Sequence, residues 1–344
     1  METILLLVHP EADGTLARPA LEALTATQAV AASLTDGRYT VGLLGSGTDA
    51  AANQIASAGA AKLLAIADER LAQARYATDA AAAEALCRAA GATVVIAPAT
   101  ARFNRVLPGV SHRLGGRADT HVSQLEAADG ALSVTRWLYR QRLRSRLTRA
   151  QRPWMLLVDP GCHPAWQGEA GSATAEPVAL PAELVVRTEV TGMKAPAADA
   201  QTIRPDAGLL FVAGAGWTKK QADGQTHVPD AEQLILGFLK QTRASLGSSK
   251  SLVDLGGEGQ AVLSFLTHLN QIGQTGATPR HPKGLSTCCH GEEPHTVGWR
   301  FITERRAINT DGNCGWARGK ADVLYIADAF AVMAKVNELL AAQG

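Results

Sequence analysis

The residues of this sequence that are best suited to binding chemistry gather between Ile272 and Trp299. The stretch opens with Gly273-Gln274-Thr275-Gly276 and continues to Gly291 and His295. Because the glycines carry no Cβ, backbone N–H groups can approach an anionic or carbonyl-rich ligand closely, and the Gln and Thr side chains add short polar contacts. These residue types at this spacing are typical of a loop that holds a cofactor.

This stretch and three neighbouring motifs resemble the alpha subunits of electron transfer flavoproteins. The family's flavin loop reads Gly-Gln-Thr-Gly and then a glycine-rich segment ending in His-x-x-Gly, as here from Gly273 to Gly298. Gly247–Gly256 is similar to Gly-x-Ser-Arg-x-x-Val-Asp-x-Gly, Ala307–Asp311 to Ala-Ile-Asn-Lys-Asp, and Ala321–Asp328 to Ala-Asp-x-x-x-x-Ala-Asp. The motifs occur in the family's order, and the resemblance extends over nearly the whole chain.

The resemblance implies an alpha-type subunit that binds FAD and forms a heterodimer with a beta-type electron transfer flavoprotein subunit. Electrons would come from a partner flavin dehydrogenase and pass to a quinone oxidoreductase or an iron–sulfur protein. The implied role is that of a carrier with no catalytic acid, base or nucleophile and no metal ligand. The implied FAD-binding residues are Ser249, Lys250, Gly273, Gln274, Thr275, Gly276, Gly291, His295, Asn309 and Asp328.

The family also suggests which part of the cofactor each residue would meet. Ser249 matches a phosphate contact, while Asn309 and Asp328 match positions that hold the adenosine and ribityl end. His295 matches a donor to the pyrimidine edge of the flavin, where negative charge gathers on reduction.

Several residues depart from the family's pattern. Ala215 stands where the family has an arginine over the flavin ring, so the flavin potential is expected to fall unless Lys219 or Lys250 supplies a cation. His290 and Pro294 replace a serine and a glutamine. These changes keep a second hypothesis open, a redox-inactive, adenylate-binding structural subunit of a multi-subunit oxidoreductase complex.

Two other patterns suggest different chemistry. Cys288, Cys289, His290 and Cys314 could supply soft metal ligands, but adjacent residues on a strand point to opposite faces and no CxxC spacing is present. Gly45-Ser-Gly47 suggests a dinucleotide loop, but the third glycine and a ribose-binding acid are missing. A nucleotide-binding sensor that uses the first domain alone remains a third hypothesis.

Length and composition limit the class of protein. A chain of 344 residues exceeds what one core usually supports, so two domains are expected. With 46% apolar residues and a formal net charge of +1, the chain has no global field for nucleic acid or an anionic membrane. Five cysteines without a CxxC pair, and an N-terminal apolar run too short for a signal or a membrane span, predict a cytoplasmic protein with no membrane insertion.

Alternating strands and helices predict an α/β fold with two doubly wound domains and mainly parallel sheets. The first domain, residues 1–185, is expected to pack on the partner subunit. Its predicted strands are Thr3–Val8, Tyr39–Leu44, Lys62–Ala67, Thr93–Ala97 and Trp154–Val158, with helices at Arg18–Ser33 and Thr48–Ser57 and before Leu114. Composition then shifts to Gly, Ala, Pro and Thr, with one strand-like patch at Leu184–Val190, and predicts a linker at residues 186–206.

Residues 207–344 are expected to form a Rossmann-like FAD-binding domain. The predicted strands are Leu209–Val212, Gly284–Cys288 and Phe301–Asn309, and the predicted helices are Asp230–Leu246, Val262–Gln271 and Val323–Leu340. Because ligands of doubly wound sheets bind beyond the carboxyl ends of the strands, the motifs that follow these strands are expected to converge on one crevice.

A hairpin-like region between Leu132 and Leu147 alternates polar and apolar residues. Arg140, Arg142, Arg144 and Arg146 fall on one face of it, which indicates either a solvated strand face or a docking surface for an acidic protein. RNA is disfavoured, because no aromatic residues are interleaved on that face to stack bases.

Overall fold

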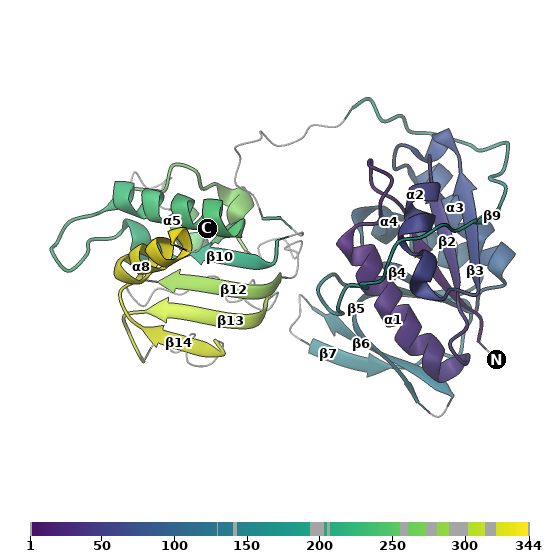
Figure 1. Ribbon diagram of the computed structural model, residues 1–344, viewed down its shortest axis with the longest axis horizontal. Coiled ribbons are helices and arrows are strands. Elements are labelled where there is room, and N and C mark those ends of the chain that lie inside the picture. Colours follow the sequence, from purple (N-terminus) through teal and green to yellow (C-terminus); the bar gives the residue numbers. More distant parts are fainter. Residues whose placement is uncertain are drawn as a thin grey trace. The chain divides into compact units, whose positions relative to one another are not determined.

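The computed structural model describes residues 2–128, 130–139, 143–192, 203–204, 207–254, 261–272, 281–288, 302–313 and 321–342. The chain divides into two compact units, Met1–Lys194 and Ala195–Gly344. Both units are α/β with mainly parallel sheets, which confirms the predicted fold class of two doubly wound domains (Figure 1). The division falls inside the segment 186–206.

The first unit is built on a nine-stranded sheet of order β7-β6-β5-β8-β4-β1-β2-β3-β9. Its central strands are unbroken apolar runs and are buried along their whole length, as parallel strands covered on both faces must be. The parallel strands are β1 Ile4–Val8, β2 Thr40–Gly45, β3 Lys62–Ala67, β4 Val94–Pro98, β8 Trp154–Val158 and the short β9 Glu176–Pro177.

Helices cover both faces of this sheet. The helices are α1 Arg18–Leu34, α2 Asp49–Gln54, α3 Tyr76–Ala90 and α4 Ala101–Arg113, with 3-10 turns η1 Ala56–Ala58 and η2 Glu69–Leu71. Ala23 and Leu24 of α1 are in the core cluster on one face, whereas Leu86 of α3 and Phe103 of α4 are in the cluster on the other face. α1 and α2 lie on one face and α3 and α4 on the other, because the chain winds first one way from β1 and then the other way from β4.

Three antiparallel strands extend the first sheet at one edge. β5 Arg117–Ala128 lies parallel to β8 and antiparallel to β6 Ala131–Leu138, which pairs with β7 Leu143–Leu147. The predicted hairpin is therefore present, and its second strand is the edge of the sheet.

A buried carboxylate ties this extension to the parallel strands. Asp119 of β5 is fully buried and accepts hydrogen bonds from the Trp154 indole N–H at 2.9 Å and from Arg149 Nη2 at 2.9 Å. Arg136 of β6 donates to the same carboxylate. Burial raises the pKa of Asp119, but hydrogen bonds from Arg149 and Trp154 outweigh it and hold the pKa below its usual value. The ionised carboxylate is thus stabilised in the folded protein.

The second unit is a five-stranded parallel sheet of order β11-β10-β12-β13-β14. Its strands are β10 Leu209–Ala213, β11 Ser245–Ser248, β12 His281–Cys288, β13 Ile302–Asn309 and β14 Val323–Ile326. The helices that accompany them are α5 Val228–Thr242, α6 Lys250–Asp254 and α8 Ala329–Ala341, with 3-10 turns η3 Ala215–Thr218 and η5 His268–Asn270. Figure 1 shows α5 and α8 lying together along one side of this sheet.

Four predicted elements differ from the structure. The predicted helix Asp230–Leu246 ends at Thr242, because Arg243 takes a left-handed conformation with φ 53° and the next residues form β11. The predicted helix Val323–Leu340 is a strand followed by a helix, since Asp328 caps a new helix at its Oδ1.

The other two errors concern segments without regular structure. Between residues 262 and 271 the only helical element is the single turn η5, so the predicted helix there is wrong. Leu184–Val190 is neither strand nor helix, although its Val and Leu content favours a strand. Among the described residues, no helix is long and apolar enough to cross a membrane.

Candidate functional site

The carboxyl edge of the second sheet is the natural place for a ligand. If the strands are numbered 1 to 5 along the chain from β10, they lie in the sheet in the order 2-1-3-4-5. The winding direction therefore reverses between β10 and β12. In sheets of this kind a crevice opens at the reversal point, beyond the carboxyl ends of the strands. The predicted site residues that the structure describes all lie along this edge, after β11, β13 and β14.

Ser249 and Lys250 connect β11 to α6. Ser249 is 1% exposed; its backbone N–H donates to the Ala213 carbonyl at 2.9 Å, and its Oγ accepts the Leu252 N–H at 3.3 Å. The exposed Lys250 ammonium lies 3.2 Å from the Asp254 carboxylate. Ser249 is therefore fixed by the start of α6, and the next residue, Lys250, carries an exposed cation that is paired with Asp254.

Asn309 is the last residue of β13 and is fully buried. Its Oδ1 accepts the Asp311 N–H at 2.8 Å, whereas its Nδ2 is buried and has no hydrogen-bond partner within the described ranges. A turn-forming role alone accounts for the oxygen but not for the amide nitrogen. The unpaired donor faces a cost of about 1–3 kcal/mol unless another group accepts its hydrogen.

Ser286 is a polar group at this edge that sequence analysis missed. It is fully buried on β12, and its Oγ has no hydrogen-bond partner in the part of the chain that the structure describes. In the sheet register Ser286 lies beside Val212 and Ala307, which form the core cluster on the face away from α5. Side chains two residues apart on a strand share a face, so Asn309 lies on the same face as Ala307 and Ser286. No sequence signal separates a serine of this kind from an ordinary strand residue.

Two further unpartnered groups lie near β11, on the opposite face. Ser248 Oγ and both side-chain polar atoms of Gln271 are buried, and no described residue forms a hydrogen bond with them. Gln271 forms a parallel bridge with Ser248 and thereby extends the sheet edge by one residue. Neither residue was among the predicted contacts.

Asp328 stands at the other end of the sheet edge. Its Oδ1 accepts the Ala331 N–H at 2.9 Å and so caps α8, and the residue is exposed. β11 and β14 are four strand spacings apart, which is about 19 Å. Ser249 and Asp328 can therefore contact one ligand only if that ligand is extended, as a dinucleotide is.

Ala215 occupies a different environment from the one its match to the family's arginine implies. It is 1% exposed in η3 and belongs to the core cluster that includes Trp217 and Phe211. The Trp217 indole N–H donates to Thr287 Oγ1 at 2.7 Å and locks this turn onto β12. A guanidinium at this position would have to enter the apolar core.

The remaining predicted contacts lie outside the described residues. These are Gly273, Gln274, Thr275, Gly276, Gly291 and His295, together with the departures His290 and Pro294. Cys289 and Cys314 of the metal hypothesis also lie outside that part of the chain. In the described residues, no group of three or more His, Cys, Asp or Glu side chains could hold a metal ion.

The predicted basic face is described only in part. Arg144 and Arg146 are exposed on the edge strand β7, while Arg140 and Arg142 lie outside the described residues. Arg146 pairs with Glu126 at 2.6 Å, and the Arg144 guanidinium lies 5.9 Å from the centre of the Trp137 ring. Two of the four arginines are thus partly neutralised or covered by their own sheet.

These features define a protein of two doubly wound α/β units, and polar groups near the carboxyl edge of the second sheet have no partner among the described residues. The family model "Electron transfer flavoprotein domain" matches residues 4–185, more than half of the chain, and the chain belongs to the electron transfer flavoprotein family. The match covers the first unit and ends before the second. A search of curated proteins finds no match to this chain.

Proposed function

We propose that this chain is the alpha-type subunit of an electron transfer flavoprotein and that it binds FAD at the carboxyl edge of its second sheet. The FAD-binding domain would comprise residues 207–344, and residues 1–185 would pack on a beta-type partner subunit. Family membership supports flavin-dependent electron transfer, and the second unit supplies a sheet edge suited to an extended ligand.

The observation that carries this proposal is the buried Nδ2 of Asn309, which has no acceptor among the residues that the structure describes. Ser286 Oγ lies on the same face of the adjacent strand and is also unpartnered. A ligand with carbonyl, hydroxyl or ring acceptors would restore the hydrogen bonds that these groups lost on burial. FAD offers such acceptors along its whole length.

Other residues would hold the cofactor without taking part in proton chemistry. Ser249 and Lys250 offer a hydroxyl and a cation at the start of α6, where a phosphate is favoured by charge. Asp328 is placed to accept from ligand hydroxyls at the start of α8. Gly273, Gln274, Thr275, Gly276, Gly291 and His295 complete the proposed set. Bound FAD supplies reversible electron acceptance, and the protein binds, orients and shields it.

A second candidate function is favoured by Ala215. This alanine is uncharged and buried in the core, whereas the family's motif has an arginine at the matching position. The chain therefore has no cation at this position to stabilise a reduced flavin. The chain could then act as a redox-inactive, adenylate-binding subunit of a larger oxidoreductase complex. In the carrier role it would instead accept electrons from a flavin dehydrogenase and pass them to a quinone oxidoreductase or an iron–sulfur protein.

Titration of flavin-free protein with FAD tests the proposal, with Asn309→Leu as the variant and Asn313→Leu as the matched control. Asn313 is exposed and only four residues away. We expect Asn309→Leu to weaken FAD binding at least about tenfold and Asn313→Leu to leave it unchanged. Equal affinities in all three proteins would contradict the site. Reversible reduction of the bound flavin would favour the carrier over the structural subunit.

A further inference from the structure

We infer that the first unit binds a small organic anion between α3, α4 and the segment that follows β9. A cavity of about 380 Å³ opens there, which is at the lower end of the range of about 300–1,000 Å³ found for small-molecule sites. The residues that line it are Tyr76, Ala77, Arg113, Val185, Arg187 and Thr188. The inference does not depend on the proposed FAD site, because every lining residue belongs to the first unit.

The strap, residues 178–192, forms one wall of this cavity. The first part of the strap is anchored to the first unit, because Arg70 Nη1 donates to the Pro181 carbonyl at 3.1 Å and to the Ala182 carbonyl at 3.2 Å. From 183 to 192 the strap forms no hydrogen bond or ion pair with any residue that the structure describes. The second part of the strap therefore has polar groups that a ligand can engage.

The opposite wall is formed by α3 and α4, where Tyr76 lies across α4. Tyr76 is the first residue of α3, and a Cβ at Gly109 of α4 would lie 1.9 Å from its hydroxyl oxygen. Glycine is unfavourable within a helix, and here it makes room for the tyrosine side chain. The Tyr76 hydroxyl has no hydrogen-bond partner among the described residues. This wall is therefore specified by the sequence, and it offers a free hydroxyl.

Two arginines supply positive charge to the cavity. The Arg113 side chain is 40% exposed, and its guanidinium lies 5.7 Å from the centre of the Tyr76 ring and 3.4 Å from the Glu84 carboxylate. Because Arg88 lies closer to Glu84, at 2.8 Å, Glu84 neutralises Arg113 only in part. Arg187 is exposed on the strap and forms no ion pair with any described residue. Both guanidinium groups can therefore turn toward a bound anion without breaking a buried contact.

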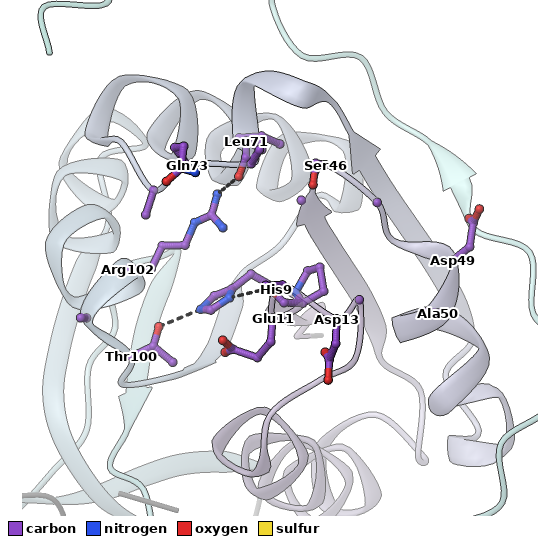
Figure 2. A pocket seen from close by; sticks show the side chains of 18 residues that line it. His9, Glu11, Asp13, Ser46, Asp49, Ala50, Leu71, Gln73, Thr100 and Arg102 are labelled. Atoms are coloured by element: carbon purple, nitrogen blue, oxygen red, sulfur yellow. Dashed lines mark hydrogen bonds between the residues drawn. The ribbon is translucent and has the colours of Figure 1, made fainter. Parts of the chain in front are cut away.

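A larger cavity of the first unit has the opposite charge pattern. It has a volume of about 750 Å³, and Glu11, Asp13 and Asp49 are among the residues that line it (Figure 2). Its lining arginine, Arg102, already donates to the buried Asp79 carboxylate at 2.6 Å. In contrast, none of the described residues that line the cavity beside the strap is Asp or Glu. The charges of the smaller cavity therefore favour an anion.

The lining residues also indicate the kind of anion. Guanidinium groups bind phosphate and carboxylate groups through paired hydrogen bonds, and the hydroxyls of Tyr76 and Thr188 add two further donors. Val185 and the Tyr76 ring provide apolar surface beside these donors. A ligand with a phosphate or carboxylate head and a compact apolar body meets both kinds of surface. Its head bridges Arg113 and Arg187 and thereby fixes the second part of the strap.

Isothermal titration of the full chain with phenyl phosphate and with benzoate tests this inference, and phenol serves as the neutral probe. We expect saturable binding of at least one anion and phenol binding that is at least about tenfold weaker. The anion that binds more tightly identifies the head group. Arg187→Gln should weaken anion binding about tenfold, and Arg113→Gln should weaken it several-fold. Arg105→Gln is the matched control, because Arg105 is a partly exposed arginine of α4 that does not line the cavity.

Trypsin cleavage after Arg187 measures whether the anion fixes the strap. Arg187 is exposed in a segment without helix or strand, which is the kind of site that proteases cut. A saturating concentration of the anion should slow this cleavage several-fold in the wild-type protein and equally in Arg105→Gln. Mass spectrometry of the fragment that ends at Arg187 follows the rate.

Four results would overturn the inference. The first is absence of saturable binding of either anion at millimolar concentration, and the second is phenol binding as tight as anion binding. The third is equal anion affinity in Arg187→Gln and Arg105→Gln. The fourth is an unchanged rate of cleavage after Arg187 at a saturating anion concentration, which would place the anion elsewhere in the chain. Circular dichroism verifies that each variant is folded.

Discussion

The buried carboxylates of the first unit differ in their hydrogen bonding from two buried polar groups of the second unit. Asp119 is paired with Arg136, Arg149 and Trp154, and Asp79 with Arg102. In the second unit Ser286 Oγ and Asn309 Nδ2 are equally buried and have no partner among the residues that the structure describes. Because an unpaired buried polar group costs about 1–3 kcal/mol, the paired carboxylates are expected to stabilise the fold, whereas Ser286 and Asn309 keep hydrogen-bonding capacity that a ligand could use.

Removing a paired carboxylate from the first unit should have the largest effect. Asp119→Ala leaves two guanidinium groups and an indole N–H without their acceptor in the interior. We expect the free energy of unfolding to fall by about 3–5 kcal/mol. Urea denaturation measures this free energy of unfolding, and Asp36→Asn on an exposed turn serves as the control. A loss below about 1 kcal/mol would show that this network is not what stabilises the antiparallel extension.

The same carboxylate predicts a pH dependence. The pKa of Asp119 is lowered in the folded protein, so its contribution is present above the unfolded pKa of about 3.9 and is lost as pH falls through the folded value. Wild-type protein should therefore lose stability more steeply than Asp119→Ala as pH falls from about 5 through the unfolded pKa and towards the lowered folded pKa. If the urea midpoints of the two proteins change with pH in parallel, Asp119 does not make this contribution to stability.

Ala215→Arg tests whether one substitution can place the family's arginine beside the proposed flavin ring. Because Ala215 is buried in an apolar cluster, the guanidinium would be desolvated without a carboxylate, and we expect a loss of about 3 kcal/mol or more in unfolding free energy. Ala215→Ser serves as a small control. A stable Ala215→Arg protein whose bound flavin has a potential raised by tens of millivolts would show instead that this position faces the ring.

Ser286→Ala tests the second edge directly. Removing an unpartnered buried hydroxyl should leave the flavin-free protein as stable as before, or more stable by up to about 1 kcal/mol. The same change should weaken FAD binding several-fold if the hydroxyl contacts the cofactor. Ser248→Ala removes an equally unpartnered hydroxyl from the opposite face of the sheet, and we expect no change in FAD affinity. Loss of affinity in the second variant alone would reverse the assignment of the faces.

The smallest effect on folding is expected on the basic edge strand. Arg144→Glu with Arg146→Glu should change the free energy of unfolding by less than about 1 kcal/mol, because both side chains are exposed. Association with an acidic partner should slow and lose part of its salt dependence, whereas Arg117→Glu on β5 should have little effect. If the beta-type subunit dissociates instead, this face is part of the permanent subunit contact.

Much of the fold could be predicted because buried parallel strands have a strong sequence signature. Lys62–Ala67 and Trp154–Val158 coincide with β3 and β8, since five or six consecutive apolar residues rarely fit another element. Two of the four errors occurred where a helix and a strand follow each other without a break in the apolar pattern. Val323–Ile326 and the following helix read as one helix because the cap at Asp328 is a side-chain hydrogen bond that depends on the turn before it.

Residues of the candidate site could be predicted only where a sequence motif resembles a motif of the family. The Asn of Ala-Ile-Asn pointed to Asn309, and the structure adds that its Nδ2 is unpaired. Ser286 could not be found in this way, because burial and lack of a partner arise from the register of β12 with its neighbours. The burial of Ala215 could not be predicted either, because a motif that places a residue in a loop does not specify which way its Cβ points.

We propose that the second unit of this chain holds FAD in a heterodimer with a beta-type subunit. Co-purification of the chain with such a subunit, followed by the visible absorption spectrum and chromatography of the released cofactor, tests it most directly. We predict flavin bands that correspond to one FAD per heterodimer and that are lost in Asn309→Leu but retained in Asn313→Leu. A stable, colourless heterodimer that releases no flavin would contradict the claim.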